Sequence, residues 1–554
     1  MKTPFVKSVA VVTALLPAVA QAAPLLEMRR VGGNVELKWP AAETHWLLQG
    51  SASLTEESWT TISESPIVVS GNNVLLQSMG STRRFFRLAC VGPDDPDAGF
   101  IDSNCDGIDG DAAQAIFVVA SGGSNLNPGT RAAPMATLPA AMQRATLQAK
   151  RAVYAGKGTY TITGTLNLTA GLSLYGQYDP ANNWSRAAVN ETTISGGKTA
   201  VAGLNINTET HLEGFTIKAA NATVPGDSSY GVRLLSSNGM VVRYNRIEAG
   251  SGAAGSPGSD FSTAPGGTDG IDGPHGEPDD EAETIPGGPG GQSPAGNTGG
   301  RGGNGGRSPG FQGEAGAPGA AGGAAGGPGG SAGNPGTAGG NGTSAPNGAN
   351  GTNGTGGAAF GNALSTGYVP SGGTGGTDGA DGKGGGGGGG GGGQECNFCQ
   401  EGTGNAGGGG GGGGSGGDRG TGGSGGGGSF GIYIYESNAV VTNNVIIAKS
   451  GGNGGKGGNG GLGGSGGEGG DGGSASLTQI GRGGNGGRGG RGGHAGSGGG
   501  GGGGPSIGLQ ITGGTVTHNT NTYTNGPGGP GGPGGFNTNS AAPAGLNGLS
   551  VATH

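Results

Sequence analysis

Three short stretches of this chain repeat one pattern, although long glycine-rich blocks separate them. They read YGVRLLSSNGMVVRYNRI (230–247), FGIYIYESNAVVTNNVII (430–447) and IGLQITGGTVTHNTNTY (507–523). Each continues from an apolar residue and a glycine into apolar residues at alternate positions. Alternation is typical of a strand with one buried face, and a repeat of roughly twenty residues is typical of a stacked solenoid. Because each copy is too short to bury its own apolar face, we predict that the copies are adjacent rungs of one interrupted solenoid.

A second spacing also recurs inside the copies. The copies contain Val242-x-x-Asn245-x-Ile247, Val441-x-x-Asn444-x-Ile446 and, as we align it, Val516-x-x-Asn519-x-Asn521. An earlier stretch has the same shape, Leu212-x-x-Phe215-x-Ile217, with phenylalanine at the asparagine position. This alignment places Phe215, Asn245, Asn444 and Asn519 at the same position of the repeat.

Glycine dominates the composition and limits the size of any ordinary core. The chain has 554 residues, of which 147 are glycine, whereas average usage is about 7%. Apolar residues are concentrated in 25–250 and in the short returns near 430 and 507, so only part of the chain can supply a conventional core. The net charge of −8 gives no electrostatic reason to expect binding to nucleic acid or to an anionic membrane.

Residues 1–22 have the pattern of a secretion signal. Lys2 and Lys7 precede an apolar run that is too short to span a bilayer, and small residues follow at Ala20 and Ala22. No later stretch is long and apolar enough to cross a membrane. We therefore expect an exported protein, extracellular or at the cell surface.

The four cysteines then predict disulfides, since an exported chain meets an oxidising environment. Proximity in the sequence favours Cys90 with Cys105 and Cys396 with Cys399, although three pairings are open. The alternative for Cys396 and Cys399 is half of a zinc site, for which Cys90 and Cys105 would have to supply the other ligands.

Residues 25–90 predict a small β module. Five short strands are expected, at 35–39, 46–49, 67–69, 74–77 and 84–88, and Trp39, Trp46 and Trp59 are expected in the core. The pattern of WP, WLLQ and a later RFFRL resembles fibronectin-III-like accessory modules of secreted bacterial proteins. That resemblance implies a β-sandwich-like spacer or a weak binder.

Residues 91–114 form an acidic linker that contains a candidate calcium loop. Its run of alternating oxygen-bearing side chains, followed by Gly107, is typical of such loops. The candidate ligands are Asp102, Asn104, Asp106, Asp109 and Asp111. Position 12 of an EF-hand would be Ala113, so Asp109 or Asp111 would have to replace the usual glutamate. The stretch resembles DxNCDGxDG segments of secreted bacterial proteins, and the alternative is a disulfide-pinned linker without metal.

Residues 115–250 open the solenoid. A strand at 116–119 is followed by a helix-like segment, 135–150, whose apolar face has Met135, Leu138, Met142, Ala145 and Leu147. Such a helix would cover the open first coil. The string from IFV through NPGTRAAP and GTY to LSLYGQYD resembles the opening of right-handed parallel β-helix proteins, in the secreted family of unassigned function. The fold class that follows is all-β, a right-handed parallel β-helix with glycine-rich insertions and a β module in front.

The glycine-rich insertions, 251–429 and 448–505, each leave the coil after the same apolar position and return at the start of the next copy. Coil residues 430–447 and 506–525 lie between and after them, and 526–554 is a glycine- and proline-rich tail. We therefore expect the insertions to project from one corner of the solenoid.

The insertion 448–505 repeats GGX, and a period of three matches the polyproline II helix. In that helix every third side chain lies on one edge, and the two glycine edges are bare. Folding the block at 474–479 would place Asp471 opposite Arg482 and Glu468 near Arg488, as in an antiparallel hairpin. The alternative is a disordered linker, because glycine loses the most entropy on ordering. The blocks resemble the PGRS repeats of surface-exposed bacterial proteins and the polyproline II bundles of some phage adhesins and of a glycine-rich antifreeze protein.

No catalytic constellation is evident in the sequence. The charged residues of the predicted coils, Arg233, Arg243, Glu213, Lys218 and Glu248, look scattered, and His211 and His518 lack an evident acid partner. The acidic run 279–281 lies in a glycine block. We therefore expect a non-enzymatic surface or matrix protein, an adhesin whose glycine-rich face binds cell-surface or matrix polysaccharide or self-associates. The alternatives are a polysaccharide lyase or hydrolase, and a protein that binds ice or a water surface.

Overall fold

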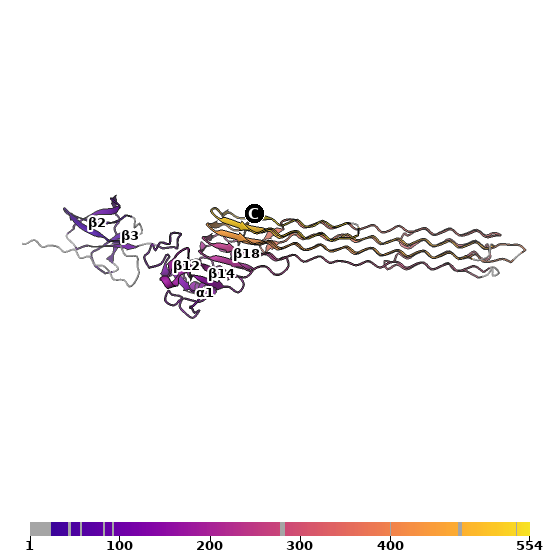
Figure 1. Ribbon diagram of the computed structural model, residues 1–554, viewed down its shortest axis with the longest axis horizontal. Helices are drawn as coiled ribbons and strands as arrows, with labels where there is room; N and C mark the ends of the chain where they lie inside the picture. Colours follow the sequence, from indigo (N-terminus) through magenta and orange to yellow (C-terminus); the bar gives the residue numbers. More distant parts are fainter. Residues whose placement is uncertain are drawn as a thin grey trace, which may run out of the picture.

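The computed structural model describes residues 24–554, apart from 42–45, 56–57, 81–82, 91–92, 278–282, 399, 475–478 and 539. The predicted signal segment 1–22 and the acidic run 279–281 therefore lie outside the described residues. Figure 1 shows three parts in a row, a small β module, a stack of parallel strands and a long bundle of extended segments.

Two antiparallel sheets form the module at residues 24–90. The first has the order β1 (Glu27–Val31), β2 (Asn34–Pro40), β6 (Asn72–Ser78), β5 (Ile67–Val69), and the second β4 (Thr60–Thr61), β3 (Trp46–Ser51), β7 (Phe85–Cys90). All five predicted strands are present. Leu37, Trp39, Leu48 and Leu75 form the core. Trp46 is also buried, whereas Trp59 is only half-buried and lies under the guanidinium of Arg87, 4.5 Å from the ring centre.

Three sheets of parallel strands follow, and the chain visits them in turn, as in a β-helix. The first sheet has the order β8 (Ala115–Val118), β9 (Ala152–Gly156), β12 (Ser173–Asp179), β16 (Thr210–Glu213), β19 (Met240–Arg243), β24 (Ala439–Thr442), β27 (Val516–Thr517). The second is β10 (Gly158–Thr161), β14 (Thr192–Gly196), β17 (Thr216–Ala219), β20 (Arg246–Glu248), β25 (Val445–Ala448), β28 (Thr522–Asn525). The third is β11 (Leu166–Asn167), β15 (Thr199–Leu204), β18 (Ser229–Leu235), β23 (Ser429–Tyr435), β26 (Ser506–Thr512), β29 (Ser550–Thr553). We call these sheets together the solenoid.

Smaller elements decorate the solenoid. They are the 3-10 turns η2 (Ala112–Gln114) and η3 (Pro180–Asn182), the strand β13 (Ser185–Arg186), which pairs antiparallel with β12, and a hairpin of β21 (Asn362–Leu364) and β22 (Gly367–Val369). The hairpin belongs to the first glycine-rich insertion. It packs on the outer face of the third sheet, where Tyr368 joins Tyr230, Phe430 and Tyr433 in an aromatic cluster.

The predicted adjacency of the repeat copies is confirmed. Val232 of β18 lies beside Ile432 of β23, which lies beside Leu509 of β26, although about 200 residues separate the first pair in sequence. Val232, Ile432 and Leu509 are fully buried in a core that runs along the solenoid.

A helix covers the first coil, as predicted. Helix α1 (Leu138–Leu147) begins after Thr137, whose hydroxyl accepts the N–H of Ala140, and its buried face packs on β8 and β9. The predicted helix was too long. Met135 is buried but pairs with Val118 as a β-bridge, and Leu147 is exposed rather than apolar core.

Asparagine side chains stack along the solenoid in what we call the asparagine column, and the repeat alignment gave the wrong residue, Asn519, for the third copy. Asn245 and Asn444 are buried, and the Asn444 Oδ1 accepts the backbone N–H of Asn245 at 3.0 Å. The next member is Asn521, whose Oδ1 accepts the N–H of Asn444, and Asn519 is exposed. Val516 pairs with Ala439 rather than with Val441, so our alignment was shifted by two residues. A shift of two preserves strand alternation, which is why the pattern alone could not detect it.

The glycine-rich insertions leave the solenoid from one corner. They start after β20, β25 and β28 at the end of the second sheet and return at β23, β26 and β29 of the third sheet. The extended segments of 250–428, 450–505 and 526–549, which we call the bundle, run out from this corner side by side (Figure 1). Hydrogen bonds join the segments of successive insertions, for example from Gly252 to Ser450 and from Gly451 to Pro527.

Inside the bundle, the backbone donates to its neighbours with a period of three. Gly385, Gly386 and Gly387 donate to the carbonyls of Gly411, Thr343 and Ala317, each in a different segment. The next three glycines repeat the cycle, with Gly408, Gly340 and Glu314 as acceptors. The run 384–393 is buried on all sides. A Cβ added at Gly387 would lie 2.1 Å from the carbonyl oxygen of Arg301, so no side chain fits there.

The number of glycines in each triplet matches the number of neighbouring segments that receive a backbone hydrogen bond. The all-glycine run 385–393 donates to the carbonyls of three segments, and the GGX stretch 481–493 donates to those of two. The stretch 255–273, with one glycine in most triplets, donates at every third residue to the segment 453–471. The X side chains of 451–473 are mostly exposed. Triplet composition therefore reports how deeply a segment lies in the bundle.

The predicted hairpin of 448–505 is present. Its legs are antiparallel, with hydrogen bonds such as Gly486 to Gly470 and Gly489 to Gly467. The expected pair of Arg488 and Glu468 forms, at 3.1 Å. Asp471 accepts a hydrogen bond from Asn485, and the fold-back overlaps 475–478, outside the described residues.

A methyl group in the centre of the bundle should destabilise it. We expect Gly387→Ala to lower the free energy of unfolding by about 1–3 kcal/mol, because the chain must shift to admit the Cβ. Urea denaturation measures this, with Arg482→Ala as the control, since Arg482 is an exposed X position of the same bundle. Equal stability of both variants would contradict the close packing of neighbouring segments around Gly387.

The asparagine column should also contribute to stability. We expect Asn444→Ala to cost about 1–3 kcal/mol, because it leaves the buried N–H of Asn245 and the carbonyl of Val242 without their partner. The matched control is Asn519→Ala at an exposed position, which should change the unfolding free energy little. If thermal denaturation shows the same loss of stability for both variants, the asparagine column does not contribute specifically to the stability of the fold.

Candidate functional site

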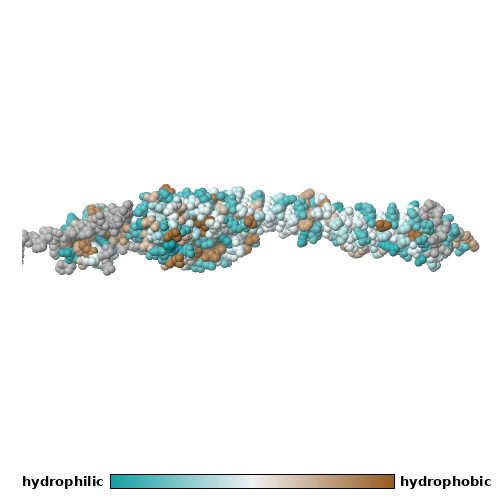
Figure 2. Space-filling model, turned by 90° about the horizontal axis from the view of Figure 1, so that it is seen from below, coloured by the Kyte–Doolittle hydropathy of each residue, from teal (hydrophilic) through white to brown (hydrophobic). Residues whose placement is uncertain are grey.

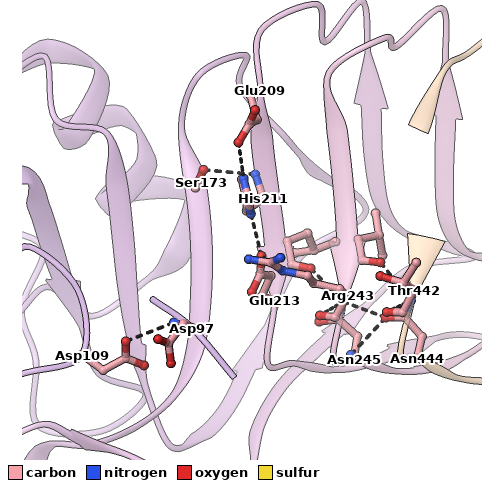
Figure 3. Close-up of polar contacts among 12 residues, drawn as sticks. Asp97, Asp109, Ser173, Glu209, His211, Glu213, Arg243, Asn245, Thr442 and Asn444 are labelled. Atoms are coloured by element: carbon pink, nitrogen blue, oxygen red, sulfur yellow. Dashed lines mark hydrogen bonds and ion pairs between the residues drawn. The ribbon is translucent and has the colours of Figure 1, made fainter. Parts of the chain in front are cut away.

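Charged side chains gather on the outer face of the first sheet, on strands β16 and β19 and on the residue just before β16. Glu209, His211 and Glu213 are alternate residues along the chain, so their side chains lie on the same face. Arg243 lies directly opposite Glu213 in the strand register. Figure 3 shows the four side chains pointing toward one another. We call Glu209, His211, Glu213 and Arg243 the histidine cluster.

The histidine cluster is a continuous chain of hydrogen bonds. The Nδ1 of His211 lies 2.6 Å from Glu213 Oε1, and its Nε2 lies 2.9 Å from Glu209 Oε1. The Nε of Arg243 donates to the same Oε1 of Glu213 at 2.5 Å. The backbone N–H of His211 donates to the hydroxyl of Ser173 on the preceding rung. One carboxylate oxygen thus receives both a ring nitrogen and a guanidinium.

Burial differs sharply within the histidine cluster. The Glu213 side chain is fully buried, and its Oε2 makes no hydrogen bond. The side chains of His211 and Arg243 are 16% and 32% exposed, and that of Glu209 is 79% exposed. Arg243 therefore balances a buried negative charge, whose removal from water would otherwise be costly.

The pKa of His211 reflects this arrangement. Burial lowers this pKa, but the hydrogen bonds to Glu213 and Glu209 outweigh burial, so that the pKa is raised above its ordinary value. The hydrogen bond to His211 lowers the pKa of Glu209. A histidine held between two carboxylates can take up and release a proton near neutral pH.

The sequence interpretation missed this cluster. We expected His211 to lack an acid partner and Glu213 and Arg243 to be scattered, and both expectations were wrong. Residues 213 and 243 are thirty positions apart, so only the rung register brings them together. The alternation of Glu209, His211 and Glu213 on a predicted strand was the available signal.

The other charged coil residues take separate places. Glu248 pairs with Arg246 at 2.6 Å, and Lys218 is exposed. Arg233 lies under the β21–β22 hairpin, where it donates to the carbonyl of Ser365 and faces the rings of Tyr230 and Tyr433. None of these side chains joins the histidine cluster.

The candidate calcium residues lie in a tight turn that packs against the first coils. Gly107 has φ +95°, as the turn requires. The carboxylate of Asp102 accepts the N–H groups of Asp106 and Gly107, and Asn104 Oδ1 accepts that of Asp106. Asp106 accepts the N–H of Ala112 and lies 3.6 Å from Arg131.

The remaining two candidate ligands point elsewhere. Asp109 is buried and pairs with Arg186 at 2.9 Å, while Asp111 accepts the N–H of Ala113 at the start of η2. Among the described residues, no group of three or more His, Cys, Asp or Glu side chains is arranged to hold a metal ion. Calcium binding would thus depend on Asp102, Asn104 and Asp106, and it stays a prediction.

The disulfide between Cys90 and Cys105 is confirmed, with Cα atoms 5.7 Å apart. It ties the end of the β module to the acidic linker. Cys396 is disulfide-bonded as well, and its predicted partner Cys399 lies outside the described residues.

The outer edges of the bundle present a second set of functional groups. The leg 480–505 displays Arg482, Asn485, Arg488 and Arg491, all exposed, at every third residue. Side chains of a neighbouring segment fix this row, since Asn341, Ser344 and Asn347 accept the backbone N–H of Asn485, Arg488 and Arg491. We call Arg482, Asn485, Arg488 and Arg491 the arginine row. Figure 2 shows mostly hydrophilic and neutral colours along the bundle.

Comparison with protein-family models, with curated proteins and with solved structures finds no match to this chain. Within the part of the chain that the structure describes, no helix is long and apolar enough to cross a membrane.

The protonation of His211 gives a direct test of the cluster geometry. We expect Glu213→Gln to lower the pKa of His211, because burial then opposes protonation without the buried carboxylate. In the wild type this raised pKa favours folding below the unfolded value of about 6.5, and that contribution is lost as the pH rises through the folded pKa. NMR titration of His211 measures the pKa, with exposed Glu64→Gln as the control. An unchanged pKa in Glu213→Gln would contradict the geometry.

Proposed function

We propose that this is an exported, non-enzymatic surface or matrix protein that adheres to cell-surface or matrix polysaccharide through the bundle. The observation that carries the proposal is the arginine row, whose side chains are exposed while their backbone is held by hydrogen bonds to a neighbouring segment. A glycan chain offers repeated hydroxyl and carboxylate groups. A guanidinium binds carboxylates with two parallel hydrogen bonds, and a row of guanidinium groups adds avidity.

Two finer structural assignments belong to this proposal. We propose that the solenoid is a right-handed parallel β-helix, since nearly all parallel crossovers in one sheet are right-handed. We propose that the bundle segments are polyproline II helices, since their donor pattern repeats every three residues. Successive residues of the arginine row three positions apart would then lie about 9 Å apart. The β module, with its two antiparallel sheets, would be a fibronectin-III-like spacer.

Export is supported by the Cys90–Cys105 disulfide, because such bonds persist in oxidising compartments. Sequencing the N-terminus of the protein recovered from culture medium tests this part of the proposal. Cleavage after Ala22 would support it, and retention of the whole chain inside the cell would refute it.

Adhesion is tested by substitution, because the block 451–504 makes interior contacts and its deletion would disturb the bundle. We expect Arg482→Ala/Arg488→Ala/Arg491→Ala to weaken binding of the full chain to cells and to an acidic polysaccharide at least tenfold, on the order of 1.4 kcal/mol. The matched control removes three exposed arginines elsewhere, in Arg30→Ala/Arg83→Ala/Arg151→Ala. Equal binding by both variants would count against the arginine row.

A polysaccharide lyase or hydrolase is the second candidate, and the histidine cluster is the observation in its favour. His211 could act as an acid or base, with Glu213 orienting the ring and Arg243 binding a sugar carboxylate. Release of reducing or unsaturated sugar ends over a panel of polysaccharides tests this activity. This release of sugar ends should disappear in Glu213→Gln. If the wild type releases none, the polysaccharides of the panel are excluded as substrates.

We also propose calcium binding at the turn of Asp102, Asn104 and Asp106, where alternating oxygen groups lie beside the disulfide. Calcium should raise the melting temperature of the wild type, since a ligand of the folded state stabilises it. That increase should be lost in Asp106→Ala and kept in the control Asp227→Ala. A wild-type melting temperature that does not respond to calcium would refute the site.

A further inference from the structure

The two ends of the solenoid are built differently. At the first coil, α1 covers the core, with Leu138, Ala141 and Ala145 fully buried. At the other end, β27, β28 and β29 are the outermost strands of the three sheets, and no described strand pairs with their outer sides. Their outer backbone N–H and C=O groups therefore form an open edge, which we call the open end.

The core is only half-covered at the open end. Ile511, Val516 and Tyr523 pack on the core but are partly exposed. Their register partners one rung earlier are Ile434, Ala439 and Ile446, of which Ile434 and Ile446 are fully buried. A further layer stacked on this end would bury the same positions in the same way.

The open end also lacks the features that usually keep sheet edges apart. Proteins protect edge strands with charged side chains or prolines. From Gly492 to His554 the chain contains no Lys, Arg, Asp or Glu. Strands β27 to β29 contain neither charge nor proline, and they are rich in β-branched threonine and valine. Such a composition favours strand pairing.

We propose that the open end pairs with the open end of a second copy of this chain, across a twofold axis. The absence of charge allows two identical ends to meet without repulsion. A twofold axis lying across the end brings the end strands of the two copies together antiparallel, one strand with its own copy and the other two with each other. Because α1 covers the other end of the solenoid, the association stops at a dimer and no fibre grows. The proposal does not rest on the adhesive function.

The test is sedimentation of the full chain over a range of concentrations. We expect a monomer–dimer equilibrium for the wild type. The variant Thr517→Lys/Thr524→Lys places charge on exposed positions of β27 and β28, and we expect it to raise the dimer dissociation constant at least tenfold. The control Leu126→Lys/Val189→Lys adds the same charge at exposed positions of the first coils and should dimerise like the wild type.

Charge complementation separates the interface from a folding defect. We expect Thr517→Glu/Thr524→Glu alone to be monomeric like the lysine variant, and an equimolar mixture of the two to recover dimers. A monomeric wild type, larger concentration-dependent oligomers, an unaffected lysine variant or a mixture that stays monomeric would each overturn the proposal. Docking of a different protein at this end would show as a monomeric wild type.

Discussion

The backbone hydrogen bond between neighbouring glycine-rich segments is the interaction on which the bundle depends. Each glycine from 385 to 393 donates its N–H to a carbonyl in another segment, at 2.7–3.0 Å. The segments approach so closely that a Cβ at Gly387 or Gly410 would lie 2.1 Å from a carbonyl oxygen. Glycine is therefore required by packing, despite its large loss of entropy on ordering. The backbone hydrogen bonds of the whole bundle, taken together, offset this loss of entropy, which isolated weak contacts could not do.

The solenoid and the bundle support each other through a common layer spacing. Adjacent rungs are joined by strand pairing, as between Val232 and Ile432, and the insertions that leave those rungs are hydrogen-bonded in turn, as between Gly252 and Ser450. Strands in a sheet lie about 4.8 Å apart, and the shared corner starts the bundle segments at that spacing. The asparagine column and the β21–β22 hairpin hold the rungs in register where the chain is most interrupted.

Much of the fold could be predicted from local pattern. The rung repeats, the capping helix, the common corner, the Cys90–Cys105 bond and the Arg488–Glu468 pair all follow from alternation, proximity or a period of three. Features that depend on register could not be predicted. Asn521 rather than Asn519 joins the column because a two-residue shift leaves the strand pattern unchanged. The histidine cluster was missed because Glu213 and Arg243 meet only across rungs.

Amide hydrogen exchange of the glycine runs 384–393 and 404–414 tests the central claim most directly. Exchange requires the N–H to break its hydrogen bond, so buried runs that donate to three neighbours should exchange only when the bundle opens. We predict slow exchange there, comparable with that of the solenoid strands β18 and β23, and faster exchange of the N–H groups that donate only to exposed side-chain oxygens, such as Arg491. Exchange of the glycine runs at the rate of an unstructured chain would contradict the account.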